Sequence, residues 1–119
     1  MPDSACGVCA IIPDYPAEKL NVILAVEADD RETRAAIAAH KTRLQITVIK
    51  VPNAGPRTKP KALNVALPFA RGTFTVVYDA EDRPEPQQLR DALAAFRNGG
   101  KDLACVQARL CIDNTADSW

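Results

Sequence analysis

Residues 74–82 read FTVVYDAED, an apolar, β-branched run that ends in three carboxylates. The segment 73–78 predicts a buried strand, because β-branched and aromatic residues favour strands. Carboxylates that directly follow a buried strand are costly unless a positive charge neutralises them. At the carboxyl end of a parallel strand, that charge is often a divalent metal carrying a phosphorylated ligand. The stretch therefore predicts a functional edge of a parallel sheet.

Strand and helix patterns alternate along the rest of the chain. The predicted strands cover residues 20–26, 44–51, 73–78 and 103–107, and the predicted helices cover 31–43, 60–70 and 83–97. This alternation predicts an α/β fold with an open, mostly parallel sheet and helices packed on its faces. Right-handed crossovers would bring the carboxyl ends of all four strands to one edge of that sheet.

Three side chains have the position of a helix N-cap. Asp29 with Glu32, and Asp82 with Glu85, have the spacing of a capping box, and Thr58 precedes the second predicted helix. A capping role does not exclude contact with a ligand, because a cap lies at the same edge of the sheet.

The predicted edge gathers acids on one side and bases on the other. A basic loop follows the second strand, and acids follow the first and third; the edge would hold Glu27, Asp29, Asp30, Arg57, Lys59, Lys61, Asp79, Glu81 and Asp82. Ligands of open α/β sheets bind along the edge formed by the carboxyl ends of the strands. Acids that face a basic loop suit a metal ion together with a diphosphate.

Composition bounds the class of protein. The 119 residues suffice for one domain, and fifteen basic residues balance fifteen acidic ones, which gives no global field for nucleic acid or an anionic membrane. No apolar run approaches the roughly 20 residues of a spanning helix. The N-terminus lacks the basic start of a secretory signal. Four cysteines without a second Cys-x-x-Cys pair indicate reduced, mostly buried thiols in a cytoplasmic protein.

Four motifs, in this order and spacing, resemble family 2 glycosyltransferases of the processive, cellulose-synthase-like kind. Residues 14–20 (DYPAEKL) are similar to the entry into the family's second strand, and 27–30 (EADD) to its acidic uracil and ribose motif. Residues 59–64 (KPKALN) resemble the K-x-x-x-L-N motif beside the donor diphosphate. Residues 79–81 (DAE) resemble the D-x-D metal motif, with Glu81 in place of the usual second aspartate.

The resemblance implies a partial GT-A fold and a nucleotide-sugar site. It implies donor binding, with a UDP-sugar as the expected donor, by Glu27, Asp29, Asp30, Lys59, Asn64 and Asp79. It implies that Asp79 and Glu81 hold Mg²⁺ or Mn²⁺ on the donor diphosphate, and that the parent enzyme transfers the sugar to a hydroxyl with inversion. The longer side chain of Glu81 would move its carboxylate and change the metal geometry.

The resemblance also predicts an incomplete domain, because the family's first strand, its general base and its Q-x-x-R-W acceptor motif have no counterpart among residues 1–119. Residues 1–13 would be a remnant and 14–119 the glycosyltransferase-like part, inactive alone and without an assignable catalytic residue. An open sheet edge would allow a homodimer, and the parent could be attached to the cytoplasmic face of a membrane.

Two other classes stay open at this stage. A phosphorelay receiver has a similar length, an acidic pair after its first strand and an aspartate after its third, which Asp29, Asp30 and Asp79 would match. It also needs a lysine after a fifth strand, which this chain lacks. A non-catalytic α/β remnant or interaction module is the other alternative.

Overall fold

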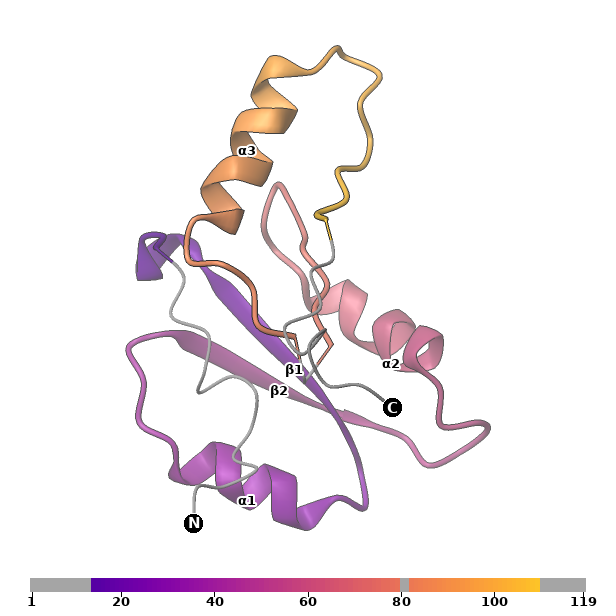
Figure 1. Cartoon of the computed structure of the whole chain (residues 1–119). Helices are drawn as coiled ribbons and strands as arrows, with labels where there is room; N and C mark the ends of the chain where they lie inside the picture. Colours follow the sequence, from indigo (N-terminus) through magenta and orange to yellow (C-terminus); the bar gives the residue numbers. More distant parts are fainter. Residues whose placement is uncertain (1–13, 80–81, 110–119) are drawn as a thin grey trace, which may run out of the picture.

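A computed structural model of the chain describes residues 14–79 and 82–109 (Figure 1). In chain order, its elements are the 3₁₀ turn η2 (Ala17–Lys19), β1 (Asn21–Glu27), α1 (Arg31–Ala39), β2 (Gln45–Val51), α2 (Lys59–Ala66), the 3₁₀ turn η3 (Leu67–Phe69) and α3 (Gln88–Asn98). The predicted α/β class is confirmed, since helices flank a parallel sheet that is consistent with part of a GT-A fold.

The sheet of the described residues consists of β1 and β2, which pair in parallel with Asn21 opposite Gln45 and Glu27 opposite Val51. Parallel strands need a crossover, and α1 supplies it. Because the strands are in register over their full length, their carboxyl ends are level. The acidic turn after β1 therefore begins beside the loop after β2.

The buried apolar side chains come from both strands and from α1. They are Val26, Ile37, Ile49 and Val51, of which Val51 is 1% exposed. Side chains alternate between the two faces of a strand, so Ile49 and Val51 share one face of β2 while Val48 and Lys50 lie exposed on the other. Helix α2 packs against both strands.

The predicted third strand is wrong in the described part of the chain, because residues 73–78 form no ladder with β1 or β2. Phe74, Val76 and Val77 are about half exposed. The segment is instead attached to α3 through side chains: the rings of Phe74 and Phe96 have centroids 4.9 Å apart, and the Tyr78 hydroxyl donates to Gln88 Oε1 at 2.5 Å. An apolar run becomes a strand only when a neighbouring strand pairs with it, which the local pattern does not specify.

The predicted fourth strand, residues 103–107, is also not a strand in this structure. Leu103 is 39% exposed and Cys105 is exposed with a free thiol, which contradicts the expected burial of that cysteine. Cys6, Cys9 and Cys111 lie outside the described residues.

Two helices end earlier than predicted, for local reasons. Helix α1 ends at Ala39 rather than at residue 43, and just beyond it the Thr42 hydroxyl accepts from Leu44 N at 3.1 Å, a bond that competes with helical pairing. Helix α2 ends at Ala66 and continues as η3, because Pro68 has no N–H for the helical hydrogen bond.

Helix α3 begins at Gln88, five residues later than predicted, and ends at Asn98. Arg83 and Glu85 each precede a proline, which disfavours helical backbone at both positions, so the helix starts only after Pro86. No helix among the described residues combines the length and apolar character needed to cross a membrane.

Candidate functional site

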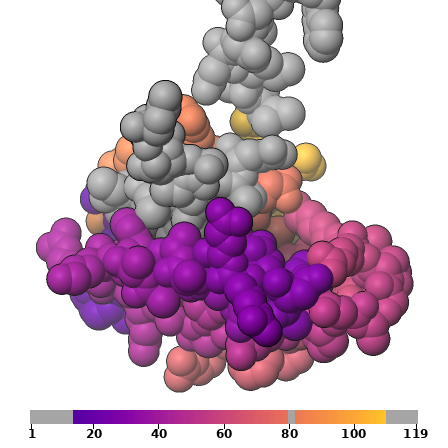
Figure 2. Space-filling model, turned by 90° about the horizontal axis from the view of Figure 1, so that it is seen from below, coloured from indigo at the N-terminus to yellow at the C-terminus, as the bar shows by residue number. Residues whose placement is uncertain are grey.

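The candidate site is the edge where β1 and β2 end. Ala28 N donates to Val51 O at 2.9 Å, which joins the residues that follow β1 to the last residue of β2. A tight turn follows, in which Asp30 N donates to Glu27 O at 3.0 Å. Figure 2 shows the purple surface around α1 and the pink surface around α2 on one face of the molecule. The turn after β1 leads into α1, and the loop after β2 leads into α2.

Asp30 is the N-cap of α1. Its carboxylate accepts from Thr33 N at 3.0 Å through Oδ1 and from Thr33 Oγ1 at 2.7 Å through Oδ2. These bonds, the hydroxyl first, hold the pKa of Asp30 below its usual value, because they stabilise the charged form. The predicted cap Asp29 is therefore wrong by one residue. Because both of its carboxylate oxygens are bound to Thr33, Asp30 stabilises the turn after β1. Asp30 lies at the edge of the sheet, as the sequence predicts.

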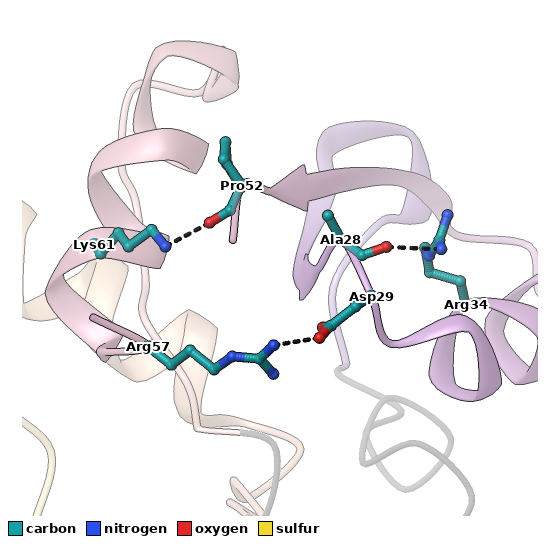
Figure 3. A network of polar contacts seen from close by, with 6 residues as sticks. All are labelled: Ala28, Asp29, Arg34, Pro52, Arg57 and Lys61. Atoms are coloured by element: carbon teal, nitrogen blue, oxygen red, sulfur yellow. Dashed lines mark hydrogen bonds and ion pairs between the residues drawn. The ribbon is translucent and has the colours of Figure 1, made fainter. Parts of the chain in front are cut away.

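Because Asp30 caps α1, the carboxylate of Asp29 is available to the basic loop that follows β2. Its carboxylate pairs with the guanidinium of Arg57, as Figure 3 shows, across 28 positions of sequence. The hydrogen bond and the charge of Asp29 hold the pKa of Arg57 above its ordinary value. Behind the turn, Arg34 Nη2 donates to Ala28 O at 2.9 Å. The turn after β1 is thus held from both sides by arginines.

A second cation–carboxylate pair joins α2 to the end of the segment 73–79. Lys59 Nζ lies 2.5 Å from Asp79 Oδ1, with each side chain about half exposed. Asp79 N donates to Asp82 Oδ2 at 2.8 Å, so Asp82 binds the end of the segment 73–79 and does not cap α3, where the cap position is Gln87. The predicted capping box of Asp82 and Glu85 is therefore wrong. Glu81, the other predicted metal ligand, lies outside the described residues.

The remaining predicted residues belong to α2 or to its N-cap and differ in their contacts. Lys61 Nζ donates to Pro52 O, which fastens α2 to the end of β2 (Figure 3). Thr58 occupies the N-cap position of α2 without a side-chain cap bond. Asn64 is exposed on α2.

Glu27 supplies an unsatisfied acceptor at this edge. Its Oε2 is buried and has no hydrogen-bond partner among the described residues. A buried polar atom without a partner is costly, and such atoms in native structures call for an explanation. A hydroxyl or N–H donor of a bound molecule would satisfy Glu27 Oε2.

The donor atoms at this edge suit a hard cation in chemistry but are not assembled into a metal site. No group of three or more metal-ligating side chains occurs within residues 14–79 and 82–109. Asp79 and Asp82 are joined by the bond from Asp79 N to Asp82 Oδ2, and their carboxylates are oxygen ligands of the kind that Mg²⁺ prefers. Among the described residues, Asp79 and Asp82 therefore have the ligand chemistry that such an ion prefers.

Arg57 is the site residue that sequence reasoning underrated. The sequence predicts its loop at this edge but does not mark Arg57 as a donor-binding side chain. Its distinguishing feature is the contact with Asp29, which depends on the tertiary fold. The only local signal was a basic residue in a loop rich in proline and glycine after a strand.

A family model described as "Glycosyltransferase like family 2" matches residues 8–119. The chain belongs to this family of glycosyltransferase-like proteins, which confirms the resemblance seen in its four motifs.

Two curated relatives are similar to the chain. Both are named poly(ribitol-phosphate) beta-N-acetylglucosaminyltransferase TarS, from Staphylococcus aureus strains Mu50 / ATCC 700699 and MW2. Each is 25% identical over 97 residues, which cover 81% of this chain and 17% of the relative. The match therefore spans about a sixth of the length of these relatives. No solved structure matches the chain significantly.

Proposed function

We propose that this chain contributes the donor-binding part of a glycosyltransferase and binds a nucleotide-diphospho-sugar through a divalent metal. The observation that carries the proposal is the joint placement, at the carboxyl edge of a parallel sheet, of an unsatisfied carboxylate oxygen on Glu27 and two cations on Arg57 and Lys59. Such edges are where open α/β sheets bind ligands. Family membership supports a transferase.

The residues take distinct roles in this proposal. Glu27 and Asp29 would accept hydrogen bonds from the base or ribose, and Asp30 would keep their turn in place through its bonds to Thr33. Lys59 would neutralise the diphosphate, and Asn64 would contact the donor from α2. Asp79 with Glu81 would hold Mg²⁺ or Mn²⁺, which supplies charge stabilisation for the leaving diphosphate when bound.

The reaction of the parent enzyme is proposed as sugar transfer to a hydroxyl acceptor with inversion. A UDP-sugar is the proposed donor. The name of the two relatives includes an N-acetylglucosaminyl group, so UDP-N-acetylglucosamine belongs among the donors to be tried beside UDP-glucose. A general base has no assigned residue in this chain.

The test is calorimetric titration of the chain with UDP, UDP-glucose and UDP-N-acetylglucosamine, with and without Mn²⁺. The proposal predicts Mn²⁺-dependent binding that Asp79→Asn abolishes. Asp102→Asn is the matched control, because Asp102 is an exposed acid in the turn after α3 and its loss leaves binding unchanged. A folded chain that binds none of the three ligands would contradict the proposal and favour a non-catalytic module.

A further inference from the structure

Two cation–carboxylate pairs cross the edge, and three of their four side chains, Asp29, Lys59 and Asp79, are ones that the proposed function requires for its ligands. Arg57 pairs with Asp29, and Lys59 pairs with Asp79. Arg57 and Asp29 come from the loops after β2 and β1, and Lys59 and Asp79 come from α2 and the segment 73–79. Each pair therefore links two separate segments of the chain. In this state the charges of these four side chains balance one another, so neither cation is free for a diphosphate and neither paired carboxylate is free for a metal.

The pairs are weak enough to exchange. The four side chains are 47–56% exposed, and exposed ion pairs of this kind contribute little because water screens them. A diphosphate offers several anionic oxygens to a lysine or an arginine, and charge-assisted hydrogen bonds to it are stronger than a single exposed pair. The cations can therefore leave the carboxylates when a diphosphate arrives.

Lys59 and a metal ion compete for the same carboxylate. The ammonium lies 2.5 Å from Asp79 Oδ1, so a divalent cation on Asp79 would lie against a like charge. Metal binding to the empty edge must then displace the ammonium or tolerate the repulsion. Binding of a diphosphate removes this conflict, because it gives the ammonium a new partner and gives the metal further oxygen ligands.

We propose that the Lys59–Asp79 and Arg57–Asp29 pairs form a counter-ion gate, in which each ligand-binding charge of the empty site is neutralised by its partner and metal binding depends on the nucleotide. The gate rests on the proposed function, because it assigns the diphosphate as the group that releases both cations. It adds Arg57 to the residues that contact the donor. By linkage, a nucleotide that strengthens metal binding is itself bound more tightly when metal is present.

The test uses Lys59→Met on the full chain with Mn²⁺ alone and with UDP plus Mn²⁺. Amide broadening around Tyr78 and Asp79 in NMR spectra reports Mn²⁺ binding, and calorimetry reports UDP. Loss of Lys59 should lower the Mn²⁺ concentration at half-broadening by about 1.5- to 5-fold, the range of an exposed ion pair. The same variant should bind UDP with Mn²⁺ about ten-fold more weakly, since a charged hydrogen bond is lost.

Three further variants test whether the effects of Lys59→Met come from the pairing of Lys59 with Asp79 rather than from a general change in charge. Lys59→Arg keeps a cation beside Asp79 and should restore the wild-type Mn²⁺ response. Arg57→Met should weaken UDP binding without changing binding of Mn²⁺ alone, because Arg57 pairs with Asp29. Lys50→Met, which removes an exposed charge from β2, should change neither. Retained amide spectra show that each variant is folded.

The outcomes distinguish failure of the gate from failure of the proposed function. If Lys59→Met leaves the Mn²⁺ response unchanged or weakens it, while Asp79→Asn still abolishes Mn²⁺-dependent UDP binding, the gate is overturned and the proposed function stands. If the folded wild-type chain binds no UDP with Mn²⁺, the proposed function fails and the gate fails with it.

Discussion

Val51 connects the small core to the candidate site, so its truncation tests how the sheet supports the edge. The side chain is 1% exposed, while Val51 O accepts from Ala28 N at 2.9 Å at the start of the acidic turn. Val51→Ala removes two buried methyl groups. At about 0.8 kcal/mol for each buried carbon, the loss is ~1.6 kcal/mol, and the cavity left behind raises it to about 2 kcal/mol.

The same strand provides a matched control in Val48, which is 38% exposed on the opposite face. Val48→Ala makes the same chemical change and loses the same strand preference, but it leaves no enclosed cavity. Its expected cost is about 1 kcal/mol or less. Urea unfolding followed by circular dichroism measures both variants, and an unchanged slope shows that the unfolded state is comparable. Equal costs, or a larger cost for Val48→Ala, would refute the burial pattern of β2.

Three further predictions concern local features near the edge. Asp30→Ala should lower the stability of the fold at neutral pH, because the bonds from Thr33 favour the charged carboxylate. The stability difference from wild type should vanish as the pH falls below 3.8 and through the lowered pKa of Asp30. Urea unfolding midpoints measured across this pH range test both statements. Gly55→Ala should cost about 1 kcal/mol in urea unfolding, since Gly55 has φ 80° with open space around it. Burial and then Asp82 raise the pKa of Tyr78, so Asp82→Asn should lower that pKa in an ultraviolet titration.

Segments whose structure depends on local patterning were predicted well. The apolar runs of β1 and β2 appear as strands within one residue of the predicted bounds, and the acids of the turn after β1 lie at the expected edge. Each of these two runs is bounded by turn or helix signals, and each finds a pairing partner in the other, so the strand that the local pattern predicts is formed.

Features that depend on tertiary pairing were not predictable in the same way. Residues 73–78 carry the same apolar pattern as β1, yet they contact α3 through Phe74 and Tyr78 and form no ladder. The spacing of Asp29 and Glu32 predicts Asp29 as the cap, whereas the structure has Asp30 in that position. Thr33 lies three residues after Asp30, and Arg57 binds Asp29 from a distant loop, so the fold assigns the two acids to different tasks. Only the first of these contacts has a local sequence signal.

The measurement that tests the central claim most directly is mapping of UDP binding, with Mg²⁺, onto the amide spectrum of the folded chain. The account predicts that the largest shifts fall on residues 27–30, 57–59 and 79, which come from three segments and meet at the carboxyl edge of the sheet. It also predicts that Glu27→Gln weakens UDP binding, because Glu27 Oε2 then loses the charge that favours a donor from the ligand. Shifts centred elsewhere, or none at saturating UDP and Mg²⁺, would contradict a nucleotide-sugar site at this edge.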